Sequence, residues 1–193
     1  MHRFMEKLAR IMAILGGLVL SFLIIMTCLS IVGRALNSVL HSDMIQGVMP
    51  GIASALLATG IGPINGDFEL VEAGLAFAIF AFIPLCQLEN AHASVDIFIS
   101  HFPKLNRKMQ VIIDVVFAAA LILIAVQLFA GMQSKQNSGQ TTFLLQLPVW
   151  WAYAASLFGA VITALVAMYI AIVRLLEAFT GKQILSIEGE AVH

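Results

Sequence analysis

The chain has 193 residues, of which 61% are hydrophobic and only 11% are charged. Soluble domains carry about 25% charged residues and about 45 to 50% apolar ones, so this composition predicts an integral membrane protein. A membrane-spanning helix needs about 20 apolar residues, and the length then leaves no room for a separate soluble catalytic or nucleotide-binding domain. The net charge of −1 offers no basic surface for nucleic acid.

Four apolar segments are long enough to cross a membrane as helices: residues 11–33, 70–88, 111–132 and 147–173. The first segment exceeds the ~7 to 15 apolar residues of a signal-peptide core, so we interpret it as a retained helix. Pro148 suits the first turn of the fourth helix, because a helix needs no N–H there. Trp150 follows it and is typical of the aromatic belt at a membrane surface.

Residues 44–66 have no formal charge, but glycines and prolines interrupt them. Only residues 51–62 form an uninterrupted helical candidate, which at ~1.5 Å per residue reaches ~18 Å. That length is short of the ~30 Å hydrocarbon core. We therefore expect an interfacial or re-entrant segment here, within a single transmembrane domain that comprises residues 1–193.

Basic residues predict the orientation, since Lys and Arg concentrate in cytoplasmic loops. With four spans, eight of the ten Lys and Arg residues fall on one side, in the two tails and in the central loop at 104–108. Both termini are therefore expected in the cytoplasm.

In the same central loop, residues 94–102 have apolar positions at helical spacing, which predicts a short amphipathic helix on the membrane surface, beside anionic lipid headgroups.

Little in the chain indicates catalytic or metal chemistry. The five histidines fall in expected loops and tails, which argues against an intramembrane haem, and the two cysteines lack C-x-x-C spacing. His92 and Asp96 are four residues apart and share one helical face, which allows a metal site. The other interpretation is that a polar residue here caps a helix entry. We expect no enzymatic activity, no cofactor and no metal.

Charged residues near the spans are more informative, because an ionisable group at mid-membrane costs ~2.5 to 3.5 kcal/mol and tends to mark function. Arg34 is expected either to pair with Glu69 or Glu72 or to remain a solvated interfacial charge. Asp114 could bind a coupling cation, but the basic residues before it favour a structural pair. Gln127 could hydrogen-bond a neighbouring helix, at roughly 1 kcal/mol.

Short motifs in a fixed order resemble one family. Gly33-Arg34 closes the first span, Glu69 enters the second, and Ala91-His92-Ala93-Ser94-Val95-Asp96 is similar to an H-x-x-V-D-type loop pattern. The fourth span opens with Leu147-Pro148-x-Trp150-x-x-Tyr153. The chain thus resembles the small membrane subunit, of DctQ type, of tripartite ATP-independent periplasmic (TRAP) transporters. It departs from the family in a longer connection at 37–65 and in the absence of a proline at 156–159.

The resemblance implies an accessory scaffold subunit in the bacterial inner membrane. Its partners would be membrane lipids, a large TRAP membrane subunit and a periplasmic binding protein that delivers an organic acid for sodium-driven import. The residues implied to be structural or partner-contact residues are Arg34, Glu69, Glu72, His92, Asp96 and Trp150. The small residues that contact either a partner or the chain's own helices are Ala118, Ala119, Ala120, Gly159, Ala160 and Ala164.

The alternative function is a self-sufficient, homo-oligomeric transporter or channel, in which Glu72 and Asp114 line the path. Secondary transporters have internal repeats and polar groups at mid-membrane, and the four spans lack both as far as the sequence shows. We therefore expect that the chain does not move substrate unaided.

Overall fold

The computed structural model describes residues 2–42, 45, 47, 50–60, 62–89 and 103–180. This part of the chain is almost entirely helical, with α1 (His2–Leu40), α3 (Pro50–Ala58), α4 (Asp67–Leu88), α5 (Pro103–Ser138) and α6 (Trp150–Thr180). Helices α1, α4, α5 and α6 are long and apolar enough to cross a membrane. The prediction of an all-α membrane protein with four spanning helices is therefore confirmed.

Two of the four spanning helices, α1 with 39 residues and α5 with 36, are much longer than their predicted spans. Apolar composition identifies only the part of a helix that can lie in the hydrocarbon core. The helix itself can extend beyond that part until a helix-breaking residue ends it. Gly33-Arg34 does not end the first helix as expected, because a single interior Gly costs only about 1 kcal/mol and α1 continues to Leu40. Within the 44–66 segment, α3 has nine residues, or ~14 Å, which is too short to span.

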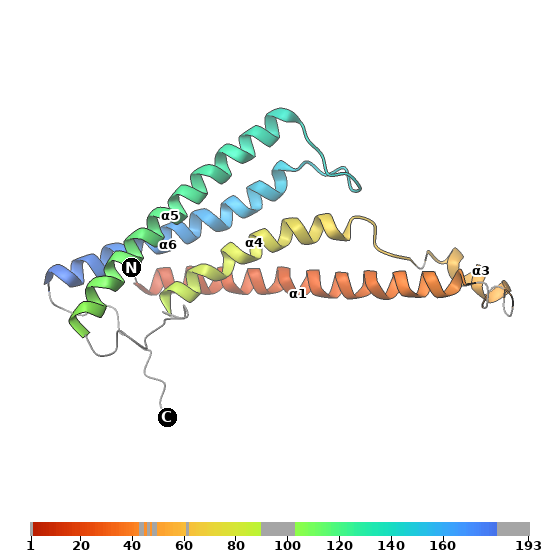
Figure 1. Cartoon of the computed structure of the whole chain (residues 1–193), viewed down its shortest axis with the longest axis horizontal. Coiled ribbons are helices and arrows are strands. Elements are labelled where there is room, and N and C mark those ends of the chain that lie inside the picture. Colours follow the sequence, from red (N-terminus) through yellow and green to blue (C-terminus); the bar gives the residue numbers. More distant parts are fainter. Residues whose placement is uncertain are drawn as a thin grey trace, which may run out of the picture.

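The spanning helices lie side by side in the order α5, α6, α4, α1 (Figure 1). Helix α6 is in the middle and contacts α5, α4 and α1, whereas α5 runs beside α6 alone among the described helices. Half of the most apolar part of α6 is buried, compared with 11% for α5. The interior of the protein is therefore built around α6.

Small residues form the contacts around α6. One apolar cluster joins Ala118 and Leu121 of α5 to three alanines of α6, at 164, 167 and 171. A second cluster joins Met12 of α1, Ala81 of α4 and Ile162 of α6. Such side chains let helix backbones approach closely, which drives association in lipid. The sequence left open whether six small residues contact a partner or the chain's own helices. Four of them pack within the chain: Ala118, Gly159, Ala160 and Ala164. The other two, Ala119 and Ala120, are exposed.

A proline inside α4 leaves a backbone carbonyl that α6 satisfies. Pro84 has no N–H, so the carbonyl of Phe80, four residues earlier, loses its helical donor. The hydroxyl of Thr163 donates to this oxygen at 2.7 Å, and it also lies 2.8 Å from the carbonyl of Gly159 in its own helix. An unpaired backbone group in lipid costs several kcal/mol. Thr163, which is fully buried, thereby stabilises both the proline site and the α4–α6 contact.

Candidate functional site at the start of helix α4

The first turn of α4 binds two other parts of the chain. Asp67 contacts α1, and Glu69, two residues later, contacts the loop between α5 and α6. A carboxylate at a helix N-terminus is also favoured by the helix dipole. The start of α4 is therefore the place where α1, α4 and the α5–α6 loop meet.

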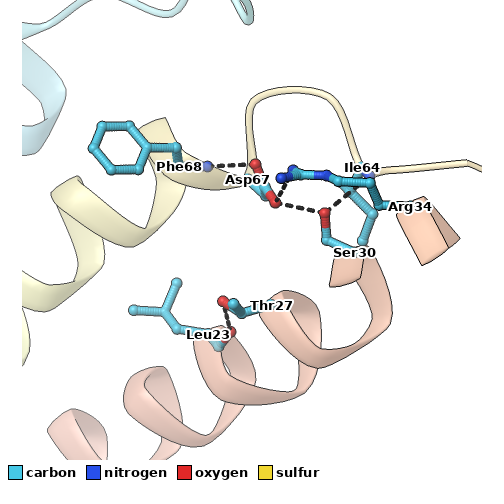
Figure 2. A network of polar contacts seen from close by, with 7 residues as sticks. All are labelled: Leu23, Thr27, Ser30, Arg34, Ile64, Asp67 and Phe68. Carbon is cyan, nitrogen blue, oxygen red and sulfur yellow. Dashed lines mark hydrogen bonds and ion pairs between the residues drawn. The ribbon is translucent and has the colours of Figure 1, made fainter. Parts of the chain in front are cut away.

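Asp67 is the centre of a polar network with Ser30, Arg34, Ile64 and Phe68, which we call the Asp67 network (Figure 2). Its Oδ2 accepts a hydrogen bond of 2.5 Å from the Ser30 hydroxyl and lies 3.8 Å from the Arg34 guanidinium. Its Oδ1 accepts the Phe68 backbone N–H at 2.8 Å, and the Ser30 oxygen accepts the Ile64 N–H at 3.2 Å. The network thus attaches the segment that precedes α4 to α1.

Ser30 and Arg34 are one helical turn apart, so α1 presents both side chains on one face. Ser30 is fully buried, whereas the Arg34 side chain is 67% exposed. The two residues therefore differ in role: the Ser30 hydroxyl is enclosed by the helix junction, whereas most of the Arg34 side chain is exposed.

Gly33 allows the connecting segment to lie against α1. A Cβ atom at this position would collide with the carbonyl oxygen of Gly62. The Gly-Arg pair of the family resemblance therefore has a packing role inside α1, about two turns before its end, instead of the expected role at the end.

Glu69 holds the tip of the α5–α6 loop. Its Oε1 accepts the Leu144 N–H at 2.7 Å, and its Oε2 accepts the Leu145 N–H at 3.0 Å. The Leu145 side chain also packs over Gly66, which has φ of 79° and has no room for a Cβ. One carboxylate thus satisfies two consecutive backbone donors that would otherwise need water.

The α5–α6 loop is held in shape by its own hydrogen bonds. The Thr142 N–H donates to the Leu147 carbonyl at 2.8 Å, and the Val149 N–H donates to the Gln140 carbonyl at 3.0 Å. These bonds leave the N–H groups of the tip pointing towards α4. The loop therefore offers Glu69 a preformed pair of donors.

The predicted partner of Arg34 was wrong. Arg34 pairs with Asp67 instead of Glu69 or Glu72, because Glu69 is occupied by the loop and Glu72 is exposed one turn further along α4. Sequence reasoning also missed Asp67 itself. One sequence signal could have indicated Asp67: Ser30 and Arg34 are donors one helical turn apart on the same face, and a carboxylate could accept from both.

The remaining predicted site residues are placed as follows. Trp150 is the first residue of α6, and its ring meets Trp151 edge to face at 6.1 Å. His92, Asp96 and the expected amphipathic helix at 94–102 lie outside the described residues. A position of Trp150 in an aromatic belt stays a prediction.

Asp114 pairs with Arg174 of α6, whose Nε lies 3.2 Å from the carboxylate. Both side chains are largely buried, at 14% and 11% exposure. This ion pair joins the beginning of α5 to the last part of α6, at the end of the bundle opposite to the α5–α6 loop. Asp114 is thus in a structural pair, as favoured from the sequence, although its partner comes from another helix.

The described residues contain no group of three His, Cys, Asp or Glu side chains that could hold a metal ion. Their long-range polar contacts join helices to each other, to the segment before α4 and to the α5–α6 loop. Fold and site together define a multi-pass membrane protein of four spanning helices.

The chain matches the family model "Tripartite ATP-independent periplasmic transporters, DctQ component" over residues 23–179. The chain therefore belongs to this family of TRAP transporter components. The matched range includes every residue of the Asp67 network and Glu69 with its loop. No curated protein and no solved structure matches the chain.

Proposed function

We propose that the chain is the small scaffold subunit of a TRAP importer in the bacterial inner membrane. It packs beside the large membrane subunit, which moves an organic acid driven by a sodium gradient after a periplasmic binding protein delivers it. The family match supports the role as a TRAP component. Both termini are proposed to lie in the cytoplasm, so that the Asp67 network faces the periplasm.

The observation that carries the scaffold role is how the chain uses its polar groups. Asp67, Glu69 and Asp114 each bind a residue of this chain. A transport path needs polar groups that line a shared cavity at mid-membrane. Instead, Glu72 and Asp114 lie at opposite ends of the bundle, which argues against the homo-oligomeric channel that these two residues would line.

The α1–α3 region is proposed to lie at the membrane surface. Helix α1 has 39 residues, or ~58 Å at 1.5 Å per residue, which is well beyond the ~30 Å hydrocarbon core. Helix α3 is uncharged and packs near the end of α1. At nine residues α3 is too short to span the hydrocarbon core, which supports its placement in the interfacial region expected from the sequence.

The test is purification of the tagged chain from native membranes in mild detergent, with identification of the proteins that accompany it. A stoichiometric large polytopic membrane protein is the expected result. Purification of the chain as a homo-oligomer without such a partner would contradict the scaffold role.

A further inference from the structure

Helix α5 exposes a continuous row of residues on the face directed away from α6. The positions are separated alternately by three and four residues, which is the spacing that one helix presents to another in a bundle. Ala118 and Leu121 of α5 are buried against α6 and lie on the opposite face. We call this row the α5 seam; all its members are exposed: Ile113, Val116, Ala120, Leu123, Gln127, Ala130 and Ser134.

Gln127 makes the α5 seam unsuited to lipid. The roughly 20 residues between Asp114 and Lys135 are uncharged and extend ~30 Å, and Gln127 is close to their midpoint. Its amide is exposed, and the structure gives it no hydrogen-bond partner among the described residues. Hydrocarbon offers no donor or acceptor, so an unpaired amide at this depth is costly. A protein group that accepts or donates a hydrogen bond would remove that cost.

The outward face of α1 shows what a lipid-facing surface of this chain is like. Its exposed residues are mostly large and apolar, among them Ile11, Ile14, Leu18, Phe22, Ile25 and Leu29, and the small exposed residues of the same face, Ser21 and Cys28, bring no amide into the membrane. The α5 seam instead contains two alanines and a serine besides Gln127. Small residues let a second helix approach closely and let polar groups bond across the interface. The two exposed faces therefore differ in the amide of Gln127 and in the alanines beside it.

We propose that the α5 seam is the surface on which a transmembrane helix of the large TRAP subunit packs, with Gln127 hydrogen-bonded to that helix. The identity of the partner rests on the proposed function, whereas the choice of face rests on the residues of the α5 seam. The edge position of α5 in the bundle leaves this face open (Figure 1). Helix α1, at the other edge, faces lipid.

The test is photo-crosslinking in native membranes with a benzophenone amino acid at one of two matched positions. Leu123 in the α5 seam is 64% exposed, and Phe22 on α1 is 62% exposed. The expected result is an adduct with the large subunit from position 123 and lipid adducts alone from position 22. Three results would overturn the choice of face. The first is an adduct with the large subunit from position 22 alone. The others are an adduct between two copies of this chain from position 123 and the absence of any protein adduct from that position.

A second measurement uses the amount of large subunit that purifies with each variant. Gln127→Leu keeps the side-chain size but removes the hydrogen bond, and about five-fold less large subunit is expected per chain. Ala120→Phe should reduce it further by blocking close approach, whereas the control Ser21→Phe, at an exposed position of α1, should not. Equal recovery from all variants would overturn the proposal. If the wild-type chain recovers no large subunit, the proposed function fails instead.

Discussion

Asp67 and Glu69, two residues apart on α4, bind different segments: Asp67 receives the Ser30 hydroxyl of α1, and Glu69 receives two backbone N–H groups of the α5–α6 loop. Because the side chains start from the same helical turn, a movement of α4 at this end displaces α1 and the loop together. The start of α4 thus fixes the relative positions of the two outer parts of the bundle.

Glu69→Gln is expected to loosen the α5–α6 loop, because the amide NH2 that replaces one carboxylate oxygen is a donor and cannot accept the second backbone N–H. Hydrogen exchange measured by mass spectrometry should show faster exchange at Leu144 and Leu145. Glu72→Gln is the matched control, since Glu72 is exposed on the same helix. Unchanged exchange in the Glu69 variant would contradict the assigned role of this carboxylate.

Replacement of Asp67 by Ala is expected to lower the Tm in detergent more than replacement of Arg34 by Ala. Asp67 accepts two hydrogen bonds, whereas an ion pair to a mostly exposed arginine contributes little. Arg34→Ala should instead reduce complex assembly or uptake without a change in substrate preference. A Tm loss for Arg34→Ala as large as that for Asp67→Ala would be evidence against this division of roles.

Thr163→Val should destabilise the protein by about 1 to 3 kcal/mol, because the Phe80 carbonyl is left unpaired. In a Pro84→Ala background, the restored N–H can satisfy that carbonyl, so the same change should cost less. A double-mutant cycle on unfolding free energies in detergent measures this difference. Additive effects would mean that Thr163 does not compensate for the proline.

Arg174→Met is expected to cost about 3 to 5 kcal/mol, since it leaves Asp114 charged and largely buried. Asp114→Leu combined with Arg174→Met should recover much of this loss, because apolar residues of similar volume can replace a buried ion pair. Unfolding of the purified chain in detergent gives both values. A double variant as unstable as the single one would point to a further function of the pair.

The number and order of the spanning helices were predictable, because each has an apolar run of bilayer length. The ends of the helices were not predictable from apolar composition, since α1 continues past Gly33 and Arg34, where its apolar run ends. The site was predictable only in part: Arg34 and Glu69 stand out as charges near spans, but their partners do not. Glu69 and Leu144 are 75 positions apart, and local patterns carry no information about such a contact.

The partner of Thr163 was also not predictable from the sequence. A threonine in an apolar helix has no sequence signal for a partner, and Pro84 alone indicates only that a carbonyl is freed. The packing of α6 on α4 brings the two together, so the compensation becomes visible only in the folded bundle.

The most direct test of the scaffold role is uptake of a candidate organic acid into liposomes under a sodium gradient. Three preparations are compared: this chain alone, the large subunit with its binding protein, and all three together. No uptake is expected from the chain alone, and full uptake is expected only when all three are present. Uptake by the purified chain alone would contradict the scaffold role and would favour the homo-oligomeric transporter.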